Sequence, residues 1–293
     1  MKFVTYERQG QEHAGILTDG KVYNLNRASK GTMPGDLLEL IKGNYAIEEL
    51  QLDEGHDLSQ VKLKAPLPRP ASIRDFYAFE EHVVTARGKR GLDVVPEWYE
   101  FPVFYFTNHH AVKGPEDSIS PPRGCEKLDY ELEIACVIGE KGRNIKANEA
   151  KDYIFGYMIM NDWSARDIQA KEMKVGLGPA KGKDFATSFG PYLVTPDEIP
   201  LHDNQLDLSM EAIVNGEQYS VGNVKDMYYS FGELIERASK DVTLYPGEVI
   251  GSGTVGSGCI LEQYGREWLK PGDRVELSIT HLGSLINVVG EEE

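Results

Sequence analysis

The alternation of apolar and polar positions divides the 293-residue chain into many short strands and few helices. Near the start, residues 2–7 and 13–25 alternate with a period of two, and Asp19-Gly20 inside the second run is typical of a hairpin turn. Residues 36–50 carry apolar side chains at helical spacing. These runs predict a small strand-and-helix unit at the N-terminus.

A proline-rich stretch follows this unit. Three prolines lie within five residues of the segment 65–71, where they disfavour helix and interrupt sheet pairing. We therefore expect a small domain over residues 1–64, a linker over residues 65–72 and a larger domain over residues 73–293.

Short β-rich runs dominate the larger part. They occupy residues 103–106, 130–138, 154–160, 192–195, 206–214, 248–251 and 274–279. Only residues 164–174 and 227–238 show convincing helical spacing there. Because strands outnumber helices and do not alternate with them, an α+β class with an irregular, mixed β-structure is favoured over a doubly wound parallel sheet.

Charge and cysteine content narrow the function classes. The net charge of −16 repels nucleic acid and anionic membrane surfaces, so we expect neither as a partner. The cysteines Cys125, Cys136 and Cys259 form no CxxC pair, which argues against a disulfide framework or a structural zinc site. With no signal-like N-terminus and no run of about 18 apolar residues, we expect a cytoplasmic protein.

Three carboxylates stand out among the candidate functional residues. Glu131 and Glu133 lie two positions apart in a strand-like run, so they point to one face and repel each other unless a cation lies between them. Asp162 ends the next apolar run. Such hard oxygen ligands suit magnesium, manganese or calcium. A strand whose glutamates face solvent is the alternative that spacing alone leaves open.

A second set of candidates follows the proline-rich stretch. Asp75 offers a further oxygen ligand, and His82 is the type of group that takes a proton from water near neutral pH. The polar residues 85–91, which include Arg90, would form a mobile lid that supplies local positive charge. A structural histidine and a solvated loop are the alternatives.

Several segments together resemble the fumarylacetoacetate hydrolase family. Residues 129–133 read Asp-Tyr-Glu-Leu-Glu, residues 156–169 contain Asn-Asp-Trp-Ser-Ala-Arg-Asp-Ile-Gln, and residues 182–187 read Gly-Lys-Asp-Phe-Ala-Thr. Residues 75–82 match the family's catalytic stretch in their separation of Asp and His. The resemblance spans roughly residues 70–285 and implies a mixed β-roll that assembles as a homodimer.

The resemblance also implies roles for individual residues. It implies a divalent cation, magnesium first and manganese or calcium as alternatives, on Asp75, Glu131, Glu133 and Asp162. It implies His82 as general base, with Lys183 and Thr187 beside the metal and the reacting oxygens. Positions that match substrate contacts are Tyr77, Tyr105, Arg166, Gln169, Thr254 and, within the lid, Arg90.

One departure from the family pattern concerns the carboxylate that polarises the histidine. In shorter relatives it lies three residues after the histidine, where this chain has Thr85. Glu80, Glu81 and Glu262 are the candidates to replace it, and the sequence does not choose among them; Glu81 is counted with His82 and Lys183 among the expected catalytic residues.

The resemblance implies hydrolysis of a carbon–carbon bond in a small anionic 1,3-diketo acid of the fumarylacetoacetate or acylpyruvate type. The alternative is decarboxylation of a β-keto acid such as oxaloacetate on the same metal site, and a metal-binding protein without catalysis is a third hypothesis. Residues 251–256 spell GxGxxG, but without a following helix they do not predict a dinucleotide site.

Overall fold

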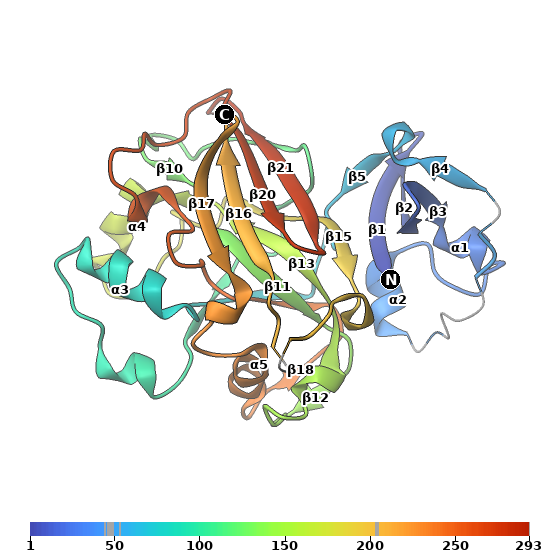
Figure 1. The fold of residues 1–293 in the computed structure, drawn as a ribbon, viewed down its shortest axis with the longest axis horizontal. Helices are drawn as coiled ribbons and strands as arrows, with labels where there is room; N and C mark the ends of the chain where they lie inside the picture. The colour runs from blue at the N-terminus through green and yellow to red at the C-terminus, as the bar shows by residue number, and fades with distance from the viewer. Residues whose placement is uncertain (44, 46–49, 53, 203–204, 293) are drawn as a thin grey trace.

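Two packed β-sheets form the body of the protein (Figure 1). The computed structural model describes residues 1–43, 45, 50–52, 54–202 and 205–292. Within these ranges no helix is both long and apolar enough to cross a membrane.

The larger sheet runs the length of the molecule. Its twelve strands follow the order β4-β3-β2-β1-β15-β13-β11-β19-β6-β7, with β5 paired to β1 and β8 paired to β15. Their bounds are β1 (Lys2–Arg8), β2 (Gln11–Thr18), β3 (Lys21–Asn24), β4 (Gly55–Asp57), β5 (Lys62–Lys64), β6 (Ser72–Phe76), β7 (Phe104–Thr107), β8 (Val112–Lys113), β11 (Leu132–Ile138), β13 (Ile154–Asp162), β15 (Thr187–Val194) and β19 (Glu248–Gly251).

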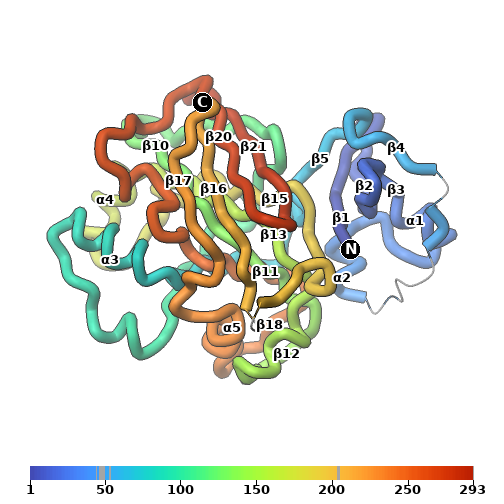
Figure 2. The backbone as a smooth tube through the Cα atoms, in the orientation of Figure 1, coloured from blue at the N-terminus to red at the C-terminus, as the bar shows by residue number. Residues whose placement is uncertain are grey.

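The second sheet covers the centre of the first. It has the order β17-β16-β20-β21-β9, and its strands pack on β11, β13 and β15 (Figures 1 and 2). Its bounds are β9 (Ser118–Ile119), β16 (Ser209–Val214), β17 (Glu217–Asn223), β20 (Arg274–Ile279) and β21 (Gly283–Val289). Two small pairs complete the strands, β10 (Leu128–Asp129) with β14 (Ser164–Ala165) and β12 (Gly142–Arg143) with β18 (Thr243–Leu244).

The helices are short and lie at the edges of the sheets. They are α1 (Leu25–Ala28), α2 (Leu37–Lys42), α3 (Glu80–Gly88), α4 (Arg166–Met173) and α5 (Phe231–Ser239). A capping box between Ser230 and Glu233 begins α5, whose apolar face includes Leu234 and Ile235. Among the 3₁₀ turns, η6 (Ile260–Glu262) packs beside α3.

Two of the sequence-based predictions differ from this structure. The helix predicted over residues 36–50 ends at Lys42, because Gly43 takes an extended backbone, and residues 44 and 46–49 lie outside the described residues. The lid predicted over residues 85–91 begins inside helix α3, which packs His82, Val83 and Ala86 against the body.

The N-terminal strands continue the sheet of the larger part. Strand β1 pairs antiparallel with β15, with Phe3 opposite Leu193. The proline-rich segment is held closely, since Leu67 is fully buried and Thr5 Oγ1 donates to the carbonyl oxygen of Pro66 at 2.7 Å. The division into a small domain over residues 1–64, a linker and a larger domain over residues 73–293 stays a prediction.

Candidate active site

Strand register gathers the predicted carboxylates at one end of the large sheet. Asp75 of β6 lies opposite Tyr105 of β7 on one side and opposite Gly251 of β19 on the other. On the far side of β19, Glu133 of β11 lies opposite Met160, two positions before the end of β13. Residues far apart in the chain therefore converge because the strands that carry them are neighbours.

The carboxylates form one buried cluster. Oxygen atoms of Asp75, Glu131 and Glu133 lie within 4.8 Å of one another. Asp162 joins them through Lys183, whose Nζ donates to Asp162 Oδ2 at 2.6 Å and also to Glu131 Oε2. The four predicted metal ligands and Lys183 are thus brought together.

The carboxylates of the cluster differ in the direction in which their pKa values are shifted. Burial opposes ionisation of Glu131, but the cations Lys183 and Arg166 offset it and lower its pKa to about 2. Burial raises the pKa of Asp75 and of Glu133 well above the ordinary range, and the charges of neighbouring carboxylates raise it further. The cluster therefore holds more carboxylates than its own cations can balance.

Buried oxygens in this cluster lack partners. Among the described residues, no hydrogen bond reaches Asp75 Oδ1, Glu133 Oε2 or Asp162 Oδ1. Gly251 leaves room for this arrangement, since an added Cβ would lie 2.6 Å from Asp75 Oδ1. A donor set made only of carboxylate oxygens could hold a hard divalent cation such as magnesium, manganese or calcium.

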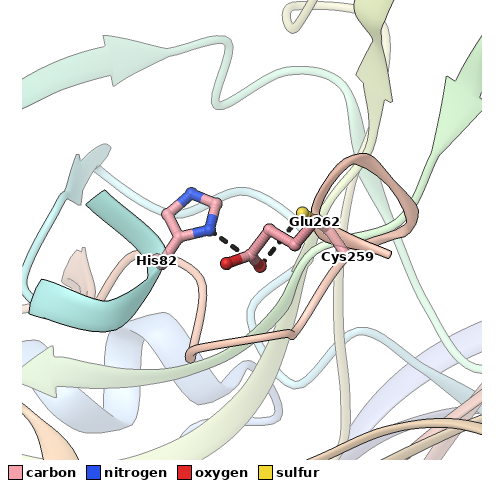
Figure 3. Close-up of side chains that lie close together, drawn as sticks. All are labelled: His82, Cys259 and Glu262. Carbon is pink, nitrogen blue, oxygen red and sulfur yellow. Dashed lines mark hydrogen bonds and ion pairs between the residues drawn. The ribbon is translucent and has the colours of Figure 1, made fainter. Parts of the chain in front are cut away.

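A histidine–glutamate pair lies next to the carboxylates. Nδ1 of His82 is 2.9 Å from Oε2 of Glu262, and the Cys259 thiol donates to the same oxygen at 3.3 Å (Figure 3). His82 is near enough to the cluster to contribute to the lowered pKa of Glu131. Helix α3 presents His82, and the turn η6 presents Glu262.

Of the three glutamates that could replace the missing carboxylate, Glu262 is the one that lies beside His82. Glu81 lies on the exposed side of α3, with its carboxylate against Gly256, whereas Glu262 contacts the imidazole. The sequence could name Glu262 as a candidate but could not select it, because it lies 180 positions after His82.

Asp129 is a residue to which the sequence pattern assigned no role. Its buried carboxylate accepts backbone N–H bonds from Ile260 at 2.7 Å and Leu261 at 3.0 Å, and it pairs with Arg166 Nε at 2.8 Å. A terminal nitrogen of Arg166 lies 2.8 Å from Glu131. Asp129 and Arg166 thus connect the turn that carries Glu262 to the carboxylate cluster.

Some of the remaining predicted residues lie at the carboxylate cluster, and the others have different neighbours. Tyr105 donates to Asp162, Thr254 Oγ1 donates to Glu133 at 3.4 Å, and Thr187 lies opposite Asp162 in the strand register. Tyr77 lies edge-on to the His82 ring at a centroid distance of 5.3 Å.

Burial raises the pKa of Tyr77 to about 12, so its hydroxyl stays protonated. Gln169 accepts from Arg166 at 3.2 Å. Arg90 is exposed beyond the end of α3 and donates to the carbonyl oxygen of Ala86 at 3.1 Å. Substrate contact by these residues stays a prediction.

Comparisons with known proteins show which family this chain is similar to. Residues 71–290 match the family model described as fumarylacetoacetate (FAA) hydrolase C-terminal. The chain is 32% identical to the oxaloacetate tautomerase YisK of Bacillus subtilis strain 168, over 99% of this chain and 100% of that protein. It is also 32% identical to a 2,4-didehydro-3-deoxy-L-rhamnonate hydrolase of Sphingomonas sp. strain SKA58, over 99% of this chain and 96% of that protein.

A solved structure supports the same grouping. The fumarylacetoacetate hydrolase from Exiguobacterium antarcticum superposes with a TM-score of 0.82 at 28% identity, and the match covers 100% of both chains. The resemblance seen in the sequence and the mixed β-fold that it implied are confirmed.

Proposed function

Because this chain belongs to the fumarylacetoacetate hydrolase family, we propose that it is a metal-dependent enzyme that hydrolyses a carbon–carbon bond in a small 1,3-diketo acid. The substrate would be of the fumarylacetoacetate or acylpyruvate type. The observation that carries this proposal is the His82–Glu262 contact of 2.9 Å beside a cluster of four carboxylates.

The cation would be held by Asp75, Glu131, Glu133 and Asp162. Members of the family use a divalent metal ion, and the unpartnered carboxylate oxygens favour a hard one, magnesium first and manganese or calcium as alternatives. When bound, such an ion polarises carbonyl oxygens and stabilises the negative charge of an enolate.

His82 would act as the general base. With Nδ1 directed at Glu262, its Nε2 is left to accept a proton from water as the water attacks the carbonyl carbon. Glu262 would orient the ring and stabilise the imidazolium that forms. The same pair could return the proton to the carbanion released by bond cleavage.

Lys183 would stabilise the oxyanion that develops during attack. Its ammonium group is buried, and the charges of Asp162 and Glu131 raise its pKa, so it stays protonated. A fixed cation in a water-poor site stabilises developing negative charge strongly. Lys183 also supplies the local positive charge that an anionic substrate needs in a chain of net charge −16.

A second candidate function is keto–enol tautomerisation of a β-keto acid. The full-length similarity to an oxaloacetate tautomerase favours it, at the same identity as the similarity to a hydrolase. Tautomerisation needs a base and enolate stabilisation but no attacking water, so the same residues could serve.

A substrate panel tests these functions. Acylpyruvates, fumarylpyruvate, fumarylacetoacetate and oxaloacetate are assayed with magnesium or manganese, and with EDTA as a control. Pyruvate or acetoacetate formed together with a carboxylic acid supports the hydrolase, whereas interconversion of keto and enol forms without cleavage supports the tautomerase. Release of carbon dioxide from oxaloacetate would instead indicate a decarboxylase.

The role of His82 is tested by His82→Ala. Turnover should be lost while magnesium binding, measured by calorimetry, is retained. His110→Ala is the matched control, since His110 is exposed and lies in a turn after β7. Turnover that survives in His82→Ala would place the base elsewhere. Light scattering of the purified protein tests the homodimer that the family resemblance implies.

A further inference from the structure

The residues around His82 form a second group of potential metal ligands, chemically unlike the first. A ring nitrogen of His82, Sγ of Cys259 and a carboxylate oxygen of Glu262 all lie within 4.8 Å of one another. This group offers one nitrogen, one sulfur and one oxygen, whereas the carboxylate cluster offers oxygen atoms only. Imidazole and thiolate favour zinc over magnesium or calcium.

The geometry is close to that of a zinc site. Glu262 Oε2 lies 2.9 Å from His82 Nδ1 and 3.3 Å from Cys259 Sγ (Figure 3). Ligands bound about 2.0–2.3 Å from one tetrahedral zinc ion lie about 3–4 Å from each other. Small side-chain rotations would therefore bring the three donors around one ion and leave a fourth position open.

The cluster is buried and has unused bonding capacity. His82, Cys259 and Glu262 are 4%, 0% and 7% exposed. Within the described part of the chain, Glu262 Oε1 makes no hydrogen bond, and the ion-pair contact with Glu262 Oε2 at 2.9 Å is the interaction recorded for His82 Nδ1. Buried polar atoms without partners are costly, and a metal ion would satisfy them.

Protonation of the thiol is the main obstacle to metal binding. Burial and the charge of Asp129 raise the pKa of Cys259 well above its ordinary range, so the free thiol keeps its proton. A zinc ion reverses this preference, because its charge stabilises the thiolate, and the proton is released to solvent. The ionised thiol and the Glu262 carboxylate then balance the charge of the ion.

We propose that His82, Cys259 and Glu262 form a zinc-binding site, and that zinc bound there inhibits the enzyme. Binding of the ion stands on the geometry alone, whereas inhibition rests on the proposed role of His82 as base. A neutral imidazole that binds zinc through Nδ1 carries its proton on Nε2, so Nε2 can no longer accept one from water.

Cobalt(II) provides a direct test, because it replaces zinc and a thiolate bound to it gives a charge-transfer absorption in the near ultraviolet. Carboxylate ligands give no such band, so cobalt in the carboxylate cluster does not interfere. The full-length protein should show the band on adding cobalt, and Cys259→Ser should not. Cys125→Ser is the matched control and should keep the band, since Cys125 lies outside the cluster.

Zinc affinity, measured by competition with a chromophoric chelator, gives a second measure that does not depend on Cys259→Ser folding. His82→Gln and Glu262→Gln should each weaken zinc binding by at least about tenfold. No thiolate band in the wild-type protein, a band that persists in folded Cys259→Ser, or unchanged affinity in both glutamine variants would overturn the site.

Inhibition is measured with magnesium at saturating concentration. Zinc should inhibit turnover at stoichiometric amounts, and additional magnesium should not restore it, because the two ions occupy different clusters. Recovery with magnesium would place inhibitory zinc among the carboxylates and overturn the inhibitory role. A thiolate band in a protein that transforms no keto acid would leave the zinc site standing and reject the proposed function.

Discussion

The carboxylate of Asp129 accepts a hydrogen bond from the backbone N–H of Ile260 at 2.7 Å, although the two residues lie 131 positions apart. Since Glu262 ends the same turn, this bond holds the residue that contacts His82. The same carboxylate pairs with Arg166, which also contacts the metal-ligand cluster. One buried group therefore sets the position of both halves of the candidate active site.

Replacing Asp129 by asparagine should strongly destabilise the protein. The change keeps the shape of the side chain but removes one of the two buried carboxylates that pair with Arg166, and breaking such a buried ion pair typically costs about 3–5 kcal/mol. Urea unfolding measures the free energy directly. Asp207→Asn is the control, because Asp207 pairs with Lys225 on the surface and should matter little. Equal losses in both variants would contradict the anchoring role of Asp129.

Glu262→Gln should lower kcat/KM by about 100-fold or more, because an amide cannot stabilise the imidazolium of His82. Glu81→Gln, on the exposed side of α3, should change it little. The loss should occur only in the first variant, since only there is the carboxylate that contacts the imidazole replaced. The opposite ranking of the two variants would identify Glu81, and not Glu262, as the partner of the base.

The central strands could be predicted from the sequence because their pattern is local. Runs 154–160 and 274–279 correspond to β13 and β20, since strands of such a core show long apolar runs or strict alternation. Helix α3 was not predicted. It is rich in charged residues, and only tertiary packing gives it a buried side.

The candidate site could be predicted only where its residues lie in local motifs. Asp75, Glu133 and Lys183 belong to short segments that resemble a known family, so each was found without knowledge of the fold. The contacts of Glu262 and Asp129 connect segments more than 100 positions apart. No periodicity encodes such contacts, because they depend on which strands become neighbours.

The carboxylate cluster should make stability depend on pH when no cation is present. The folded-state pKa values of Asp75 and Glu133 are raised, so the folded protein holds protons that the unfolded chain releases. The free energy of unfolding therefore falls as pH rises from about 4 towards neutrality. The pKa of Glu131 is lowered to about 2, so its ionisation stabilises the folded protein. This stabilisation is lost only in more acidic solution.

A divalent cation bound by these carboxylates should remove the loss of stability that their ionisation causes. The gain in Tm on adding magnesium should therefore increase with pH. Thermal unfolding with EDTA or magnesium, from about pH 5 to 8, measures the difference. The variant that combines Asp75→Asn with Glu133→Gln should lose most of the pH dependence. A magnesium effect of the same size at every pH would indicate that the ion binds away from these carboxylates.

Lys183→Met should separate metal binding from catalysis. Lys183 neutralises Asp162 and Glu131, so its removal leaves the cluster more negative, and magnesium should bind more tightly. Turnover should nevertheless fall by about 100- to 1,000-fold, because the cation that stabilises the oxyanion is gone.

Calorimetry and kcat, measured on the same preparation, test both parts of this prediction. Lys181→Met is the control, since Lys181 is exposed and pairs with Asp184 at 2.8 Å outside the cluster. If Lys183→Met loses magnesium binding together with turnover, Lys183 serves mainly to hold Glu131 and Asp162 in place. If turnover survives while binding tightens, the developing oxyanion is stabilised without Lys183, which leaves the bound cation as its main electrostatic partner.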